Sequence, residues 1–182
     1  MKILLIYGTT EGQTQKIATF LADQVAQRGH HTQVINAIDE IAATLDPREF
    51  DAVIVAASVH AGHYQSAIIH FVRKNLAAID IRPNAFVSVS LAAAGDDEDD
   101  ARGLKQCLTA FTQHTGWTPK VTHHAAGAFR YTAYDFLKRW AMKYIAYRKG
   151  GPTDTSRDCE LTDWADLSRF ITDFLGTIAG EH

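Results

Sequence analysis

Short apolar runs alternate along the chain with longer stretches in which apolar residues recur at helical spacing. The run at 52–57, Ala-Val-Ile-Val-Ala-Ala, is rich in β-branched residues and apolar on both faces, which predicts a strand at the centre of a sheet. Four further strands are expected from similar patterns, at 3–7, 31–36, 85–90 and from about Val121 towards Phe129.

Amphipathic helices are expected between these strands. Ile17, Leu21 and Val25 lie on one face of a helix that Gly29 ends. Further helices are predicted at 66–74, at 101–111 and after Thr162, which is taken as the N-cap of the last one. Strands that alternate with helices indicate an α/β protein with a parallel, doubly wound sheet.

Length and composition limit the classes of protein to consider. With 182 residues and no Pro-, Gly- or Ser-rich linker, the chain is expected to form one domain over 1–182. A formal net charge of −3 argues against nucleic-acid binding, which depends on clustered lysines and arginines. Cys107 and Cys159 form no CxxC pair, so neither a disulfide framework nor a zinc site is expected.

The distribution of apolar residues also predicts the location of the protein. The apolar stretch at 1–7 is too short for a signal-peptide core. No run approaches the ~20 apolar residues that a membrane span requires. We therefore expect a cytoplasmic protein whose contact with membranes is peripheral.

A loop rich in glycine and threonine follows the first strand. Its backbone N–H groups open a helix and three hydroxyls stand among them, which is typical of an anion site. The spacing matches neither GxxxxGK[ST] nor GxGxxG, so one phosphate monoester, such as that of FMN, is favoured over triphosphates and dinucleotides. The residues assigned to this site are Thr9, Thr10, Glu11, Gly12, Gln13 and Thr14. The alternative is a loop that merely connects strand to helix.

Two more loops should lie beside this site, because ligands of doubly wound sheets bind beyond the carboxyl ends of the strands. We expect them to supply apolar walls and backbone donors to the flavin ring. The assigned residues are Ser58, Val59, His60, Ala61, Gly62, Tyr64, Ser90, Leu91, Ala92, Ala93 and Gly95. Metal ligation or acid-base catalysis by His60 and His63 is the alternative, but no carboxylate or cysteine lies near them in sequence and no metal is expected.

An insertion at about 130–158 interrupts the alternation near the last strand, and its first part is basic and rich in aromatic residues. On a helix its apolar residues form one stripe flanked by cations, as in helices that lie on a membrane surface or hold a planar anionic ligand. A core helix with solvated charges fits the composition equally well. If the insertion contacts substrate or membrane, the residues expected to do so are Arg130, Tyr131, Lys138, Arg139, Trp140 and Lys143.

The segment Leu5-Ile-Tyr-Gly-Thr-Thr-Glu-Gly-Gln-Thr14 resembles the phosphate-loop signature of the flavodoxin family. Blocks at 57–67, 126–131, 150–155 and 162–164 resemble the quinone-dependent protoporphyrinogen oxidase branch of that superfamily. The resemblance implies a flavodoxin-like five-stranded sheet in the order 2-1-3-4-5 and FMN as the cofactor.

The same resemblance implies a reaction of haem synthesis. Protoporphyrinogen IX would be the substrate, and menaquinone or ubiquinone would accept the electrons. The chemistry would be centred on the flavin, with no catalytic side chain, and the protein would attach peripherally to the inner face of the cell membrane.

An acidic run at 96–100 departs from these expectations, because it would repel an anionic substrate. Electron-carrying flavodoxins commonly carry acidic residues at this place. A flavodoxin-type carrier that docks on redox partner proteins is therefore an alternative function, and a flavin-binding regulatory module without turnover is a third.

Overall fold

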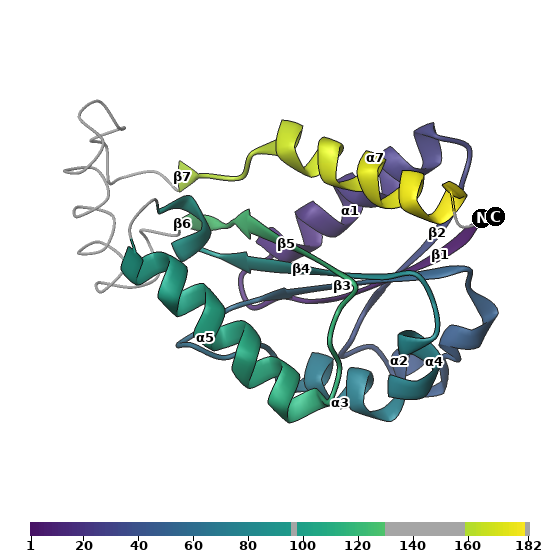
Figure 1. Cartoon of the computed structure of the whole chain (residues 1–182), viewed down its shortest axis with the longest axis horizontal. Helices are drawn as coiled ribbons and strands as arrows, with labels where there is room; N and C mark the ends of the chain where they lie inside the picture. The colour runs from purple at the N-terminus through teal and green to yellow at the C-terminus, as the bar shows by residue number, and fades with distance from the viewer. Residues whose placement is uncertain (96–97, 130–158, 181–182) are drawn as a thin grey trace.

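The computed structural model describes residues 1–95, 98–129 and 159–180 (Figure 1). Its centre is a parallel five-stranded sheet in the order β2-β1-β3-β4-β5, as the resemblance to flavodoxins implied. The strands are β1 (Lys2–Gly8), β2 (His31–Asn36), β3 (Ala52–Ser58), β4 (Asn84–Ser90) and β5 (Val121–Ala126). The middle of the sheet is fully buried, which explains why β3 reads as a continuous apolar run from Ala52 to Ala57.

Helices cover both faces of the sheet (Figure 1). On one face lie α1 (Gln13–Gln27) and α7 (Trp164–Gly180), which pack against each other and against the sheet. On the other lie α3 (Ser66–Lys74) and α5 (Glu98–Thr115). The shorter elements are α2 (Glu40–Thr44), η1 (Pro47–Glu49), α4 (Leu76–Asp80) and η2 (Ala92–Ala94), none of which the apolar spacing predicted.

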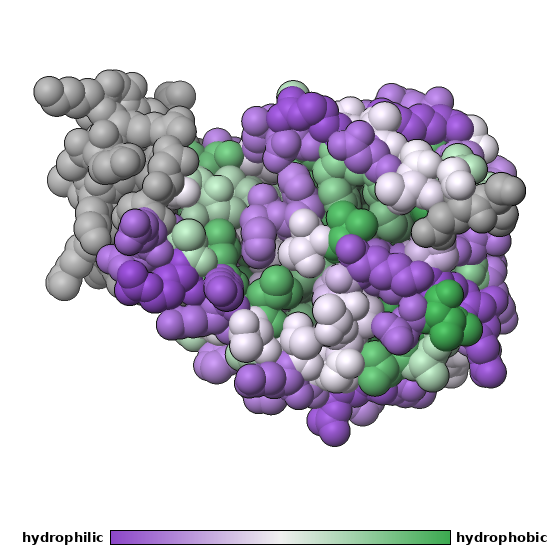
Figure 2. All heavy atoms as spheres, in the orientation of Figure 1, coloured by the Kyte–Doolittle hydropathy of each residue, from purple (hydrophilic) through white to green (hydrophobic). Residues whose placement is uncertain are grey.

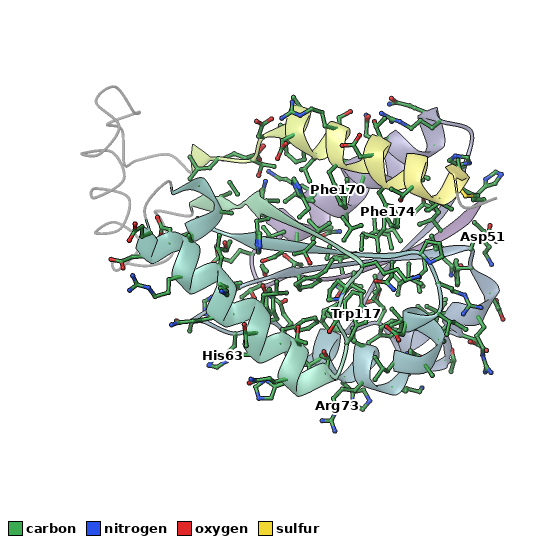
Figure 3. The ribbon with its side chains drawn as sticks, viewed as in Figure 1. Asp51, His63, Arg73, Trp117, Phe170 and Phe174 are labelled. Carbon is green, nitrogen blue, oxygen red and sulfur yellow. The ribbon has the colours of Figure 1, made fainter. Side chains whose placement is uncertain are left out.

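Each face has its own apolar core. On the α3 and α5 side, the rings of Phe86 and Phe111 stack at 4.6 Å and 6°. Trp117, which is completely buried, meets both rings edge-on. On the other side, Phe170 and Phe174 of α7 point towards the sheet, opposite Trp117 (Figure 3). Large aromatic residues on both faces therefore hold the layers together.

The last strand is shorter than predicted. β5 ends at Ala126, and after Gly127 the chain enters β6 (Ala128–Phe129), which pairs antiparallel with β7 (Cys159–Glu160). The N–H of Gly127 donates to the Ser90 carbonyl at 3.0 Å, which keeps the chain beside β4 at the point where it leaves β5. The predicted single strand towards Phe129 is therefore wrong, because apolar pattern alone does not reveal where a strand changes partner.

The predicted N-cap of the last helix is also wrong. Asp163 precedes α7, and its Oδ1 accepts the N–H of Asp166 at 2.9 Å. The Thr162 hydroxyl instead donates to the Ala126 carbonyl at 2.7 Å. A hydroxyl committed to the end of β5 cannot cap the helix. The predicted insertion at 130–158 lies outside the described residues, within which no helix is long and apolar enough to cross a membrane.

Candidate functional site

A cleft of about 1040 Å³ lies at the carboxyl ends of β1, β3 and β4. Figure 2 shows apolar surface at this end of the molecule, near η2 and β6. Most of the sequence-predicted cofactor residues line the cleft: Thr9, Thr10, Glu11, Gly12, Gln13, Thr14, Ser58, Val59, His60, Ala61, Gly62, Ser90, Leu91 and Ala92. Tyr64, Ala93 and Gly95 lie outside the lining. Three loops far apart in sequence thus meet where the doubly wound topology brings them together.

The loop after β1 is shaped as an anion cradle. Gly12 has φ +90°, a conformation that favours glycine, and its N–H donates to Thr9 Oγ1 at 2.9 Å. The first α-helical hydrogen bond runs from the N–H of Lys16 to the Gly12 carbonyl at 3.2 Å. The N–H groups of the preceding turn therefore have no helical acceptor, and no acidic side chain occupies that turn. Free amides and the positive end of α1 favour a bound anion.

Thr14 provides the test of whether a phosphate group fits this loop. Its side chain lines the cleft but is completely buried, and its Oγ1 has no hydrogen-bond partner among the described residues. A buried hydroxyl without a partner is costly unless a ligand pairs with it. A phosphate oxygen is such a partner, so the loop fits the phosphate of FMN.

Gln65 is a site residue that sequence reasoning missed. Its Nε2 donates to Ser58 Oγ at 2.6 Å and to Thr10 Oγ1 at 3.1 Å, and so joins the loop after β1 to the loop after β3. A side chain on Gly8 would meet Gln65 Oε1 at 3.0 Å and Ile68 Cγ1 at 2.7 Å, so glycine is required there. The only available signal was a glutamine directly before a predicted helix, which says nothing of these partners.

The loop after β3 turns back sharply at residues 60–63. The backbones of His60 and His63 exchange two hydrogen bonds, at 2.8 and 3.0 Å. Ala61 and Gly62 between them have φ +50° and +82°, as in a type I′ turn. Positive φ is unusual for alanine, so the surrounding structure must stabilise it. One such contact is Cys107 Sγ on α5, which donates to the Gly62 carbonyl at 3.4 Å.

The loop after β4 forms the third wall. Ser90 lines the cleft, and its Oγ accepts the N–H of Ala93 at 3.1 Å, which starts the turn of η2. The N–H of Val59 donates to the Val89 carbonyl at 2.8 Å and so fixes this loop beside the one after β3. Ala93 itself supports the turn from outside the lining.

Tyr64 was expected to flank the ring, but it points into the core. Its hydroxyl lies 2.8 Å from Ser88 Oγ, and its ring packs edge-on against Phe86 and Phe111. Burial raises the pKa of Tyr64 to about 12. The tight turn at 60–63 carries the chain from the cleft back to the α3 face, and Tyr64 is the first residue after that turn.

Charged groups gather where α1 meets β7. Lys16 Nζ lies 3.2 Å from Glu160 Oε2, and the Trp164 indole N–H donates to Glu160 Oε1 at 2.9 Å. Burial by itself raises the pKa of Glu160. Hydrogen bonds from Lys16, Trp164 and Gln13 lower it by more, so the pKa of this carboxyl lies below its usual value. Gln13 Nε2 also donates to Thr162 Oγ1 at 2.9 Å, so this predicted cofactor residue uses its amide to hold the chain near β7.

The predicted substrate or membrane residues Arg130, Tyr131, Lys138, Arg139, Trp140 and Lys143 all lie outside the described residues. The structure places none of them relative to the cleft. Their assignment stays a prediction from sequence.

Comparison with known proteins supports a common ancestry over nearly the whole chain. Residues 4–156 match the family described as "Flavodoxin domain". The protoporphyrinogen IX dehydrogenase [quinone] of Escherichia coli strain K12 is 32% identical over 172 residues, which cover 93% of this chain and 92% of that protein. The protein of the same name from Leishmania major is 31% identical over 174 residues, covering 95% and 74%.

Two solved structures share the fold. A short-chain flavodoxin associated with a bacterial microcompartment superimposes with a TM-score of 0.56 at 12% identity, covering 98% of this chain and 99% of that one. An archaeal flavodoxin gives a TM-score of 0.53 at 14% identity, with the same coverage. At such identities the likeness concerns the fold alone.

Proposed function

The chain belongs to the flavodoxin-domain family, and we propose that it oxidises protoporphyrinogen IX to protoporphyrin IX with FMN as cofactor and a respiratory quinone as electron acceptor, in haem biosynthesis. One observation carries the proposal: the Escherichia coli relative with this activity in its name aligns over nearly the full length of both chains. An alignment that included only the phosphate loop would have supported flavin binding and no reaction.

The residues that would hold FMN follow from the cleft. The N–H groups at the start of α1 and the hydroxyls of Thr9 and Thr14 would bind its phosphate. The loops at 58–62 and 90–92 would wall its ring with small apolar side chains and backbone groups. When bound, FMN supplies the two-electron redox chemistry of the reaction. No side chain acts as a nucleophile in this reaction. The protein would therefore position the substrate beside the cofactor and exclude water from both.

Substrate and membrane contacts are assigned to the insertion, outside the described residues. Its composition supports this, since Arg139, Lys143 and nearby cations suit the two propionates of a porphyrinogen and the headgroups of anionic lipids. Peripheral attachment to the inner face of the cell membrane would bring the protein to its quinone. Reversing the charges of Arg139 and Lys143 should raise the porphyrinogen KM or release the protein from anionic vesicles, and no change in either would contradict the assignment.

An electron carrier is the second candidate, because the start of α5 carries Glu98, Asp99 and Asp100 near the cleft. Such a carrier would pass electrons to a basic partner protein and would not reduce quinone. A strongly stabilised one-electron-reduced state without quinone reduction would favour it.

An anaerobic assay tests the proposed reaction. FMN-loaded protein is mixed with protoporphyrinogen IX, and porphyrin fluorescence is followed with and without menaquinone or ubiquinone. We expect fluorescence to rise at a rate that depends on quinone concentration. The matched control is the triple variant Thr9→Val, Gly12→Val and Thr14→Val, which should lose both FMN and activity. Protein that retains FMN but forms no porphyrin with either quinone would contradict the proposal.

A further inference from the structure

We propose that Thr162 is a positioning residue for FMN binding, which holds the phosphate loop in place through Gln13. The inference rests on the proposed function and deepens it, because it assigns a new residue to the cofactor site. Thr162 belongs to the Thr-Asp-Trp segment at 162–164, to which the proposed function gives no role. It lies outside the lining of the cleft, so it acts only through the residues that it contacts.

The first contact of Thr162 is with the phosphate loop. Its Oγ1 accepts a hydrogen bond from Gln13 Nε2 at 2.9 Å. Gln13 is buried, lines the cleft and begins α1. It precedes Lys16, whose N–H makes the first helical hydrogen bond, so the main-chain N–H of Gln13 is one of the free donors of this turn. Thr162 therefore fixes a residue whose main chain would face the phosphate.

The second contact of Thr162 leads to the loop after β4. Its hydroxyl donates to the Ala126 carbonyl at the end of β5, at 2.7 Å. The next residue, Gly127, donates its N–H to the Ser90 carbonyl at 3.0 Å and accepts the N–H of Leu161 at 3.1 Å. Ser90 lines the cleft and opens the wall at 90–92. Thr162 thus joins the phosphate loop to the third wall of the cleft.

This link completes a closed set of connections among the three loops. Gln65 joins the phosphate loop to the loop after β3 through Thr10 and Ser58. The N–H of Val59 joins the loop after β3 to the loop after β4. With Thr162, each loop is tied to both of the others. Loops that are fixed before a ligand binds cost less to order on binding, and a ligand that spans two loops gains most.

The contact of Thr162 has a counterpart at the far end of the same helix. Figure 1 shows α1 and α7 side by side. There Thr172 Oγ1 accepts from Arg28 Nη2 at 2.6 Å and donates to the Ser168 carbonyl at 2.7 Å. Arg28 lies about 24 Å along α1 from Gly12, at 1.5 Å per residue. Thr172 therefore joins α1 to α7 with the same chemistry as Thr162 but far from the phosphate loop.

Flavin titration of the apoproteins tests the inference without turnover. We expect Thr162→Val to raise the Kd of FMN about 5- to 10-fold, because the link to Gln13 is lost. Thr162→Ser keeps the hydroxyl and should restore the Kd to within about twofold of the wild type. Thr172→Val is the matched control and should also stay within about twofold.

Riboflavin separates positioning from a general loss of stability. It has no phosphate, so Thr162→Val should leave its Kd within about twofold, whereas a loosened fold would weaken both flavins alike. Urea unfolding shows whether each apoprotein is folded. Thr162→Ala repeats the test if Thr162→Val does not fold. An unchanged FMN Kd, or equal losses for FMN and riboflavin, would overturn the inference.

A double-mutant cycle tests whether Thr162 acts through Gln13. Gln13→Leu and Thr162→Val remove the same hydrogen bond, so the double variant should bind FMN no more than about twofold more weakly than the weaker single variant. Losses that multiply in the double variant would show that the two residues act independently, which would also overturn the inference.

Failure of the inference is distinguishable from failure of the proposed function. If the wild-type protein oxidises protoporphyrinogen IX with FMN but Thr162→Val binds FMN as the wild type does, the reaction stands and the role of Thr162 is wrong. If the wild-type protein binds FMN but oxidises no protoporphyrinogen with any acceptor, the proposed function is wrong, and the titrations still decide the role of Thr162.

Discussion

The side-chain amide of Gln65 lies 2.6 Å from Ser58 Oγ, to which it donates a hydrogen bond. The same nitrogen reaches Thr10 Oγ1 at 3.1 Å. One side chain therefore connects the loop that would bind phosphate with the loop that would bind the flavin ring. The two ends of the cofactor site are held in a fixed relation before any ligand binds, which reduces the cost of ordering them on binding.

Replacing Gln65 by leucine should weaken FMN binding. Two hydrogen bonds between the loops are lost, at about 1 kcal/mol each, so the Kd of FMN should rise about 5- to 30-fold. Fluorescence titration of apoprotein measures it. Gln27→Leu, on the exposed end of α1, is the control and should bind FMN as the wild type does. Equal Kd values for the two variants would show that the bridge is not needed.

Thr14→Val should separate stability from phosphate binding. Valine has nearly the same shape but lacks the buried hydroxyl that has no partner within the described residues, so apoprotein should be as stable as the wild type or more stable by about 1 kcal/mol. FMN should bind about tenfold more weakly, whereas riboflavin, which has no phosphate, should bind unchanged. Urea unfolding and flavin titration provide the measurements. Equal losses for FMN and riboflavin would place the hydroxyl elsewhere in the site.

Tyr64→Phe should leave the flavin site intact and lower stability. Ser88 loses its partner in a buried position, which should cost about 1 kcal/mol, while the Kd of FMN stays within twofold. A raised FMN Kd would instead indicate that Tyr64 contacts the flavin ring, as the sequence predicted.

The pH dependence of unfolding should carry the signature of Tyr64. Its folded pKa of about 12 exceeds the unfolded value of about 10, so the unfolded state releases its proton first. The stabilisation that the buried, neutral Tyr64 adds to the folded state is fully present below pH 10 and is lost as the pH rises towards 12. Unfolding free energy should therefore fall more steeply over that window in the wild type than in Tyr64→Phe, and identical slopes would refute this.

His123 should make the stability of the protein depend on pH in the acidic range. Burial lowers its pKa below 6.5, although Asp166 opposes this from 3.5 Å, and its ring stacks on Phe170 at 4.7 Å. The unfolded state then binds the proton more readily, so stability should decline as pH falls below about 6.5. Thermal melts of wild type and His123→Gln between pH 5 and 8 compare the slopes, and the variant should show the weaker decline. Parallel curves would rule out this contribution.

The phosphate loop could be located in the sequence because its determinants are local. Gly12 must adopt positive φ and the threonines must stand at the start of a helix, and both conditions are visible within seven residues. Tyr64 shows the opposite case. It lies two residues beyond Gly62 in the sequence, yet the turn at 60–63 sends it to the core. A short-range pattern cannot show which side of a turn faces a cleft.

By itself the sequence determined the parallel α/β architecture and predicted the loop after the first strand as an anion site, because strand burial, helical spacing and turn chemistry are properties of neighbouring residues. Only the tertiary structure decided that Gln65 joins two loops, that Thr162 binds the end of β5, and that the cleft continues along α1. These contacts depend on how elements distant in the chain pack, and the free energy of packing is shared among many residues, so no single segment encodes it.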